Sequence, residues 1–264
     1  MTECMIDIVA TPDHPGVPWW QAVTPDGFVA GVAGLRPTGP HGLLLPPALC
    51  VTPCAADLNL YVEPQWRRRG IGSRLLAAVR AQTTERHLAV EVAAGTPAEA
   101  FCLRHGFRHA RTVRHDLLAY ADVHRAWLGE LVDAGHRGYR LTCWSGDVPP
   151  DSSVADLIGS PSRPGDTVLT VADDGGDLAA YAVAVVDPRP RARQYGPAVL
   201  PAHRGRRLGR WVNAALIQRL REVHPHVEEI ETVTPEDDAP LLALREHLGF
   251  RPVRRTRRYE LPLR

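Results

Sequence analysis

A short arginine- and glycine-rich signature occurs twice in this chain, at a separation of 137 positions. The first copy, PQWRRRGIG, runs from Pro64 to Gly72, and the second copy, PAHRGRRLG, runs from Pro201 to Gly209. The proline, the first arginine and the last glycine of each copy all keep the same offset. A signature repeated at one fixed offset predicts a duplicated module.

Each copy follows an apolar, strand-like run and precedes an amphipathic helix. Residues 58–62 form the run before the first copy, and Leu75, Leu76 and Val79 mark one face of the helix after it. A glycine-rich turn that opens a helix presents free backbone N–H groups and the positive end of the helix dipole. Such a turn can hold a pyrophosphate group.

The signature resembles the coenzyme A loop of the GNAT N-acetyltransferases. A dinucleotide-binding loop would need three spaced glycines and a downstream acidic residue, and a Walker loop would need Gly-Lys-Ser/Thr. Neither pattern is present in the two copies. The resemblance implies an α/β (α+β) fold, in which each domain has a mixed, mostly antiparallel sheet flanked by helices, and it implies acetyl-CoA as co-substrate.

A second element of the same family also occurs twice, as FCLRHGF at 101–107 and LREHLGF at 244–250. Each resembles the helix ending in Gly-Phe that lies beside coenzyme A, where the glycine ends the helix. We therefore expect two tandem GNAT domains, at residues 1–120 and 121–264. The organisation is similar to that of actinobacterial proteins of the mycothiol synthase type.

The resemblance assigns coenzyme contacts to both loops. In this family a backbone N–H on the strand before the loop polarises the thioester carbonyl. That donor falls near Tyr61 and Val62 in the first half, and near Val199 and Leu200 in the second. The remaining expected contacts are Arg67, Arg68, Arg69, Gly70, Ile71 and Gly72 in the first loop, and Arg204, Gly205, Arg206, Arg207, Leu208 and Gly209 in the second.

Direct transfer to an amine also needs a base. Glu91 and Glu231 are the candidates because each lies on the strand after a loop and helix, and Glu63 lies at the mouth of the first loop. Each of these glutamates has an alternative interpretation as a surface carboxylate.

The chain departs from the family pattern at four places. The common tyrosine acid is replaced by Cys102 and Arg245, and a frequent asparagine is replaced by Gly95 and Asp238. Cys102 could act as an acid or as a nucleophile, or it could be a small buried residue. Arg245 could balance the charge of a thiolate or phosphate, or it could face solvent.

The first glycine of the signature is replaced by Arg207 in the second copy, and an arginine there is compatible with a helical φ angle, so that the loop can still form. The substitution makes a close approach of phosphate to the backbone less certain in the second loop. The first half therefore has the better coenzyme loop.

The two modules differ in the elements predicted for their N-terminal parts. Strands are predicted at 28–35, 58–62 and 88–92 in the first module, and too few residues precede Phe28 for the two helices that normally build the acceptor side of a GNAT domain. In the second module we predict helices at 122–134 and 154–158, a strand at 139–144, and a hairpin of 168–172 with 178–186. Substrate loops are expected between residues 148 and 165.

Composition limits the class of protein. A net charge of +1 argues against a general nucleic-acid binder, although arginines cluster at 67–69, 204–207 and 254–258. The sequence has no apolar run of the roughly 20 residues that cross a bilayer and no signal peptide, so a cytoplasmic monomer or homodimer is expected.

Five scattered cysteines do not form a disulfide framework. Cys50 and Cys54 flank Pro53 with no second pair, and the glycine of His105-Gly106-Phe107 should separate His105 from His109, so no metal site is expected.

Two functions stay open. The first is a small-molecule N-acetyltransferase that transfers acetyl from acetyl-CoA to a primary amine. The second is a non-catalytic or regulatory acyl-CoA-binding protein with degenerate sites. Asp147, Asp151 and Asp156 hint at a cationic acceptor, although aspartate is also an ordinary turn and cap residue.

Overall fold

The computed structural model describes residues 6–11, 18–37, 55–149 and 152–263 of the chain. Its contacts divide the chain into two compact units. The first contains residues up to 38, residues 52–111 and the C-terminal residues 257–264, and the second contains residues 112–256 together with a segment outside the described residues. The units are described separately below.

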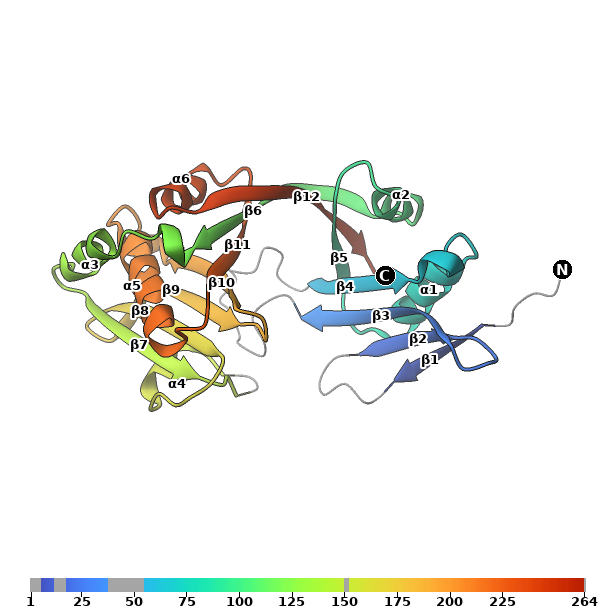
Figure 1. Cartoon of the computed structure of the whole chain (residues 1–264), viewed down its shortest axis with the longest axis horizontal. Helices are drawn as coiled ribbons and strands as arrows, with labels where there is room; N and C mark the ends of the chain where they lie inside the picture. The colour runs from blue at the N-terminus through green and yellow to red at the C-terminus, as the bar shows by residue number, and fades with distance from the viewer. Residues whose placement is uncertain (1–5, 12–17, 38–54, 150–151, 264) are drawn as a thin grey trace. The chain divides into compact units, whose positions relative to one another are not determined.

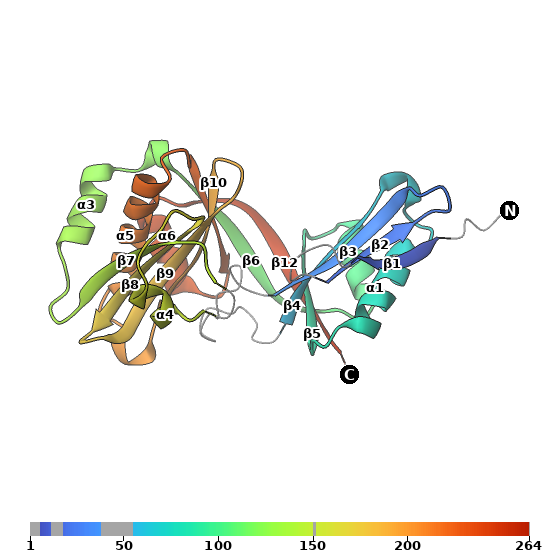
Figure 2. The same ribbon diagram turned by 90° about the horizontal axis from the view of Figure 1, so that it is seen from below.

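The first unit is a sheet with helices on one face (Figures 1 and 2). Its strand order is β1-β2-β3-β4-β5-β12, and every pair is antiparallel except β4 with β5. Helices α1 (Ile71–Gln82) and α2 (Pro97–Arg104) carry buried residues of the same core. The strands are β1 (Asp7–Thr11), β2 (Trp19–Val23), β3 (Val29–Pro37), β4 (Ala55–Val62), β5 (His87–Val92) and the end of β12 (Arg251–Pro262).

The second unit has helices on both faces of its sheet. Its strand order is β12-β6-β11-β10-β9-β8-β7, with β10 and β11 parallel. Helices α3 (Arg125–Asp133), α5 (Leu208–Val223) and α6 (Ala239–His247) pack against one core, and α4 (Val154–Gly159) packs against another. The remaining strands are β6 (Arg108–Ala119), β7 (Arg140–Gly146), β8 (Thr167–Asp174), β9 (Asp177–Val186), β10 (Arg191–Val199) and β11 (Glu229–Pro235).

Two long strands belong to both units. The C-terminal half of β12 pairs with β5 of the first unit, from Arg257 opposite Val92 to Pro262 opposite His87. The later part of β6 pairs with β11 of the second unit, from Val113 opposite Pro235 to Ala119 opposite Glu229. A single boundary after residue 120 therefore does not separate the compact units, because the last strand of the second sequence module completes the first sheet.

The predicted elements agree with the structure where the pattern was local. The strands expected at 28–35, 58–62 and 88–92 correspond to β3, β4 and β5, and the second module contains the predicted helices, strand and hairpin. Strands β1 and β2 were not predicted. Both strands lie in the stretch before Phe28.

The arginine cluster near the C-terminus is a set of ion pairs. Each of the four arginines in the cluster at 254–258, and Arg251 before it, has a carboxylate partner outside β12: Arg251 with Asp122, Arg254 with Glu231, Arg255 with Glu236, Arg257 with Glu99, and Arg258 with Asp57.

Candidate functional site

The two signature loops share one backbone path. Each begins as a single turn of 3₁₀ helix, η1 (Pro64–Trp66) or η3 (Pro201–His203), followed by an extended arginine, Arg67 or Arg204. Two left-handed residues follow in each loop, Arg68 and Gly70 in the first (φ 64° and 81°) and Gly205 and Arg207 in the second (φ 76° and 60°). The copies therefore exchange which of the two left-handed positions holds glycine.

Arg207 does not have the helical φ angle considered for it from the sequence. Arg207 is the N-cap of α5 in a left-handed conformation, as Gly70 is for α1. The loop geometry is preserved, and the second copy keeps it with a residue that pays a steric cost there.

The helices that follow the loops start without side-chain caps. A cap side chain accepts a hydrogen bond from a backbone N–H in the first turn of α2, α3, α4 and α6; the accepting residues are Thr96, His124, Ser153 and Asp238. At α1 and α5 the N-cap residue makes no side-chain hydrogen bond. Their first N–H groups can therefore serve an anionic ligand.

Two loop arginines order the turn. The Nε of Arg67 donates to the carbonyl of Val62 at 2.8 Å, and the Nε of Arg204 approaches the carbonyl of Val199 at 3.5 Å. Arg69 stacks over the ring of Trp66 at 5.0 Å, and Arg206 donates to the hydroxyl of Tyr139 at 2.5 Å. Both loops bring cationic groups to an open helix start.

The last glycine of each signature permits close packing of the helix. A Cβ added at Gly72 would lie 3.2 Å from the ring of Phe101, and one added at Gly209 would lie 3.3 Å from Val199. These glycines hold the start of α1 against α2 and the start of α5 against β10.

Beside each loop the two parallel strands separate. In the first unit, β4 and β5 pair only from Ala55 opposite His87 to Asp57 opposite Ala89. In the second, β10 and β11 pair only from Arg191 opposite Glu229 to Gln194 opposite Thr232. We call the opening beyond these last pairs the strand gap of each unit.

One of the two expected backbone donors in each half faces the strand gap. The N–H of Glu63 donates to Ala30 on β3, and the N–H of Leu200 donates to Ala179 on β9. Since N–H directions alternate along an antiparallel strand, Tyr61 also faces β3, whereas Val62 and Val199 face the gap. Val62 and Val199 are therefore the available donors, and the N–H groups of Tyr61 and Leu200 serve the sheet.

The gap edge of β10 differs from that of β4. Strand β10 contains a bulge between Tyr195 and Ala198, and Pro197 inside it has no N–H. Strand β4 pairs with β3 without a register shift over Ala56–Val62. The first unit thus keeps a regular edge of peptide groups along its gap.

The carboxylate candidates lie in different surroundings. Glu91 is exposed on β5 opposite Arg258 of β12. Asp57 was not singled out from the sequence. It belongs to the last residue pair of β4 and β5 before the strand gap, and its carboxylate forms an ion pair with Arg258 at 2.9 Å. Burial raises the pKa of Asp57, and the nearby Arg258 partly offsets this. The signal was a single acid inside an apolar strand run.

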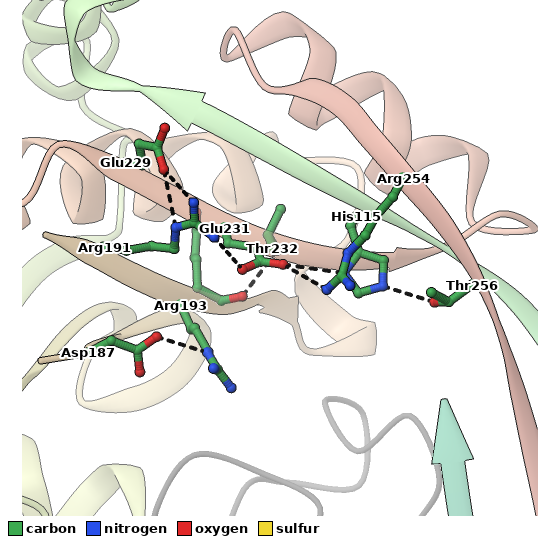
Figure 3. A network of polar contacts seen from close by, with 10 residues as sticks. His115, Asp187, Arg191, Arg193, Glu229, Glu231, Thr232, Arg254 and Thr256 are labelled. Carbon is green, nitrogen blue, oxygen red and sulfur yellow. Dashed lines mark hydrogen bonds and ion pairs between the residues drawn. The ribbon is translucent and has the colours of Figure 1, made fainter. Parts of the chain in front are cut away.

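Glu231 is held by two arginines and a histidine (Figure 3). Its carboxylate lies 3.3 Å from Arg254, 3.4 Å from Arg191 and 3.4 Å from the Nδ1 of His115. Burial acts to raise the pKa of Glu231, but Arg254, His115 and Arg191 together hold it below its ordinary value. Such a carboxylate is a weaker base than a free glutamate.

Glu231 and Glu91 are not equivalent in position. Glu231 lies opposite Arg193, before the strand gap opens, whereas Glu91 lies two residues beyond the last parallel pair. His115 and Thr256, joined at 2.9 Å in the same network, were not singled out from the sequence, because β6 and β12 bring them to β11 from distant positions.

The residues that replace the family tyrosine are both buried. Cys102 is 3% exposed, and burial raises the pKa of its thiol to about 11, which gives no support to a nucleophilic or acidic role. Arg245 is 1% exposed, so it does not face solvent. Burial lowers the pKa of Arg245 to about 9, while Asp116 acts in the opposite direction, and the guanidinium remains cationic at neutral pH.

Structural roles account for several other candidates. Asp238 caps α6 through the N–H of Leu241 at 3.1 Å. Asp156 is part of the capping box of α4, and Asp147 accepts from the N–H of Asp166 at 3.1 Å. The hint of a cationic acceptor from these aspartates is therefore lost, and Asp151 lies outside the described residues.

Two open cavities, of about 460 and 470 Å³, lie in the second unit away from the strand gap. Both are lined by Arg140 and Asp173, whose side chains form an ion pair at 3.2 Å. Gly175 of the turn between β8 and β9 also lines the first cavity, and Gly176 of the same turn also lines the second.

Among the described residues, no group of three or more histidine, cysteine or acidic side chains could hold a metal ion, and no helix is long and apolar enough to cross a membrane. The break between His105 and His109 is confirmed, because α2 ends before Gly106, which has φ 83°. Cys50 and Cys54 lie outside the described residues.

Comparison with known protein families assigns both halves. Residues 18–109 match the model described as acetyltransferase (GNAT) domain, and residues 135–250 match the acetyltransferase (GNAT) family. A search of curated proteins found no match.

Solved structures share the fold. A tandem GNAT protein from the clavulanic acid biosynthesis pathway matches with a TM-score of 0.67 and 23% identity over 97% of this chain and 85% of that one. A GCN5-related N-acetyltransferase from Sphaerobacter thermophilus matches with a TM-score of 0.55 and 17% identity over 93% and 81%. A GCN5-related N-acetyltransferase-like protein from Streptococcus suis gives 0.56 and 12% over 98% and 89%.

Proposed function

The chain belongs to the GNAT acetyltransferase family, with two such domains in tandem, and from this premise we propose that it is a cytoplasmic enzyme that transfers acetyl from acetyl-CoA to a primary amine of a small molecule. The observation that carries the proposal is in the first unit. There an uncapped helix start, a loop with three arginines and the gap-facing N–H of Val62 follow one another along β4 and α1.

These parts match the ends of the coenzyme. The loop and the start of α1 would take the pyrophosphate group, because they combine free N–H donors with cationic side chains. The regular edge of β4 would pair with the amide-containing arm. The N–H of Val62 would then polarise the thioester carbonyl.

The reaction would be direct transfer. The neutral amine attacks the thioester carbon, a C–N bond forms, the C–S bond breaks, and coenzyme A leaves as a thiolate. The amine proton passes to a carboxylate on the helix-free face, where Asp57 and Glu91 lie near each other. A raised pKa suits Asp57 to this role, since a base works best when its pKa approaches the working pH.

Calorimetric titration with acetyl-CoA tests the coenzyme assignment. We expect Arg68→Asp to weaken binding by about 10-fold or more, because it reverses one charge at the loop while aspartate tolerates a left-handed backbone. Arg80→Asp makes the same charge change in the last turn of α1 and should alter affinity by less than about 2-fold. Equal effects of the two variants would show that the loop is not the binding site.

A second candidate function is acyl-CoA binding without transfer. It is favoured by the absence of the family tyrosine from both halves, at Cys102 and Arg245. Release of free thiol from acetyl-CoA in the presence of amines, amino sugars and amino acids distinguishes the two functions. Release no faster than the blank, with coenzyme binding intact, would favour the second.

A further inference from the structure

Arg245 lies where the strand gap of the second unit begins. It belongs to α6 and occupies the position four residues before Gly249. Its Nη2 donates a hydrogen bond to the carbonyl of Gly196, which lies in the bulge of β10 just beyond the last parallel pair at Gln194. A long cationic side chain from the helix thus reaches the strand edge at the start of the gap.

The guanidinium is held there by its surroundings. It lies 5.1 Å from the ring centroid of Phe250, and the buried carboxylate of Asp116 attracts it. Asp116 in turn forms an ion pair with Arg114 at 2.8 Å. If the guanidinium of Arg245 moved away from the Gly196 carbonyl, it would still be buried near Asp116, but its charge would be less well compensated. Moving it is therefore unfavourable.

Among the described residues, the Nε and Nη1 of Arg245 and the Oδ2 of Asp116 have no hydrogen-bond partner, whereas the Oδ1 of Asp116 faces Arg114. The hydroxyl of Thr234 on β11 is also buried, and within the part of the chain that the structure describes nothing forms a hydrogen bond with it. These polar groups do not form a complete internal network.

The first unit has a different residue at the equivalent place. Cys102 stands four residues before Gly106 on α2, and its side chain ends one atom beyond Cβ. It packs with the apolar core instead of bonding to the adjacent strand edge. The edge of β4 continues without a bulge, whereas the edge of β10 has both the bulge and Pro197.

We propose that Arg245 is a specificity-determining residue that closes the second unit to the amide-containing arm of coenzyme A. The arm would need the edge of β10 at Gly196, which the guanidinium already occupies. The second unit then carries a signature loop of the right shape but does not take a complete coenzyme. Because this rests on the proposed function, in which the first unit binds acetyl-CoA, the chain should bind one coenzyme and not two.

Calorimetry with coenzyme A, supported by thermal unfolding, tests the proposal on the full chain. The wild-type protein should bind one molecule per chain, and Arg245→Cys, which copies the first unit, should bind two. Arg245→Cys leaves the buried carboxylate of Asp116 without this cation, and adding Asp116→Asn removes that charge. If Arg245→Cys alone does not fold, the double variant serves in its place and should also bind two coenzyme molecules. Two sites in the wild type, or one site in a folded double variant, would overturn the proposal.

A further variant separates this inference from the proposed function. Arg68→Asp in the opened background should weaken the first site by about 10-fold or more and leave the affinity of the second unchanged. If the wild type binds no coenzyme but the opened variant binds one, the proposed function of the first unit fails and the closure by Arg245 stands. If the opened variant loses all binding with Arg68→Asp, the gained site does not belong to the second unit and the closure proposal fails.

Discussion

Arg207 shows how one residue can hold a loop in a conformation that it does not favour. It has φ 60°, in a position where the other loop has Gly70. A left-handed conformation costs an ordinary L-residue about 1–2 kcal/mol, and glycine avoids this cost but gives up more entropy on folding.

We therefore expect Arg207→Gly to raise the free energy of unfolding by about 0.5–1 kcal/mol in urea. Arg204→Gly is the control, because Arg204 is extended with φ −65° and has no strain to relieve. A stability gain from Arg204→Gly as large as that from Arg207→Gly would contradict the strain explanation.

The two described cysteines should differ in reactivity. Cys102 is buried with a pKa of about 11, so only about one thiol in a thousand is ionised at pH 8. Cys143 is exposed and serves as the internal control. In a chain with Cys4, Cys50 and Cys54 changed to serine, a thiol reagent should label Cys143 first and Cys102 only on unfolding. Fast labelling of native Cys102 would revive its candidacy as a nucleophile.

At the scale of elements, the last strand is fastened to α2 by Glu99. Its carboxylate accepts from the hydroxyl of Tyr259 at 2.6 Å and from the N–H of Gly95 at 2.7 Å, and it pairs with Arg257 at 2.7 Å. The hydrogen bonds from Tyr259, Gly95 and Arg257 lower the pKa of Glu99 to about 2. The charged form is therefore favoured in the folded chain.

This pKa sets the sign of a pH effect. Because the folded pKa lies below the ordinary 4.5, the stabilisation from Glu99 is present above about pH 4.5 and disappears as the pH falls toward 2. Glu99→Gln should be less stable than wild type at pH 7, and the difference should shrink between pH 4.5 and 2. Thermal unfolding across this range measures it, and a constant difference would contradict the ionic origin.

For the whole molecule, β12 couples distant parts of the chain, because its C-terminal half completes the sheet of the first unit. Leu261 on β12 is 6% exposed and contributes to the core of the first unit, opposite Leu88. Leu261→Ala should cost about 2–4 kcal/mol. Hydrogen exchange should rise in β4 and β5, although these strands belong to the first sequence module.

Val253→Ala is the matched control on the same strand, because Val253 is 54% exposed. It should change stability by less than about 0.5 kcal/mol. Exchange that rises in β10 and β11, with β5 unchanged, would show that β12 supports the second unit instead.

Local patterns made much of this protein predictable. The spacing of proline, arginine and glycine in the two signatures indicates a turn before a helix, and both turns form, although Arg68 and Arg207 adopt left-handed conformations that such residues do not favour. Apolar periodicity likewise located β4, β5 and α1. The likeness to mycothiol synthase-type proteins and the identity of the acceptor amine remain predictions.

The properties of the site depended on contacts between distant residues. Strand register decides that Val62 and not Tyr61 faces the gap, and pairing across the sheet brings Arg258 to Asp57 and Glu91. Burial turns Cys102 and Arg245 from candidate reactive groups into a packed thiol and a buried cation.

The sequence by itself determined that the chain is two related modules, each with a turn that opens a helix, because turns and helix starts follow from neighbouring residues. Only the tertiary structure decided which residues meet at each strand gap and that the last strand completes the first sheet. The physical reason is that register, burial and ion pairing arise between segments far apart in the chain. The two copies share a loop, and the residues that pack beside each loop make the two halves different.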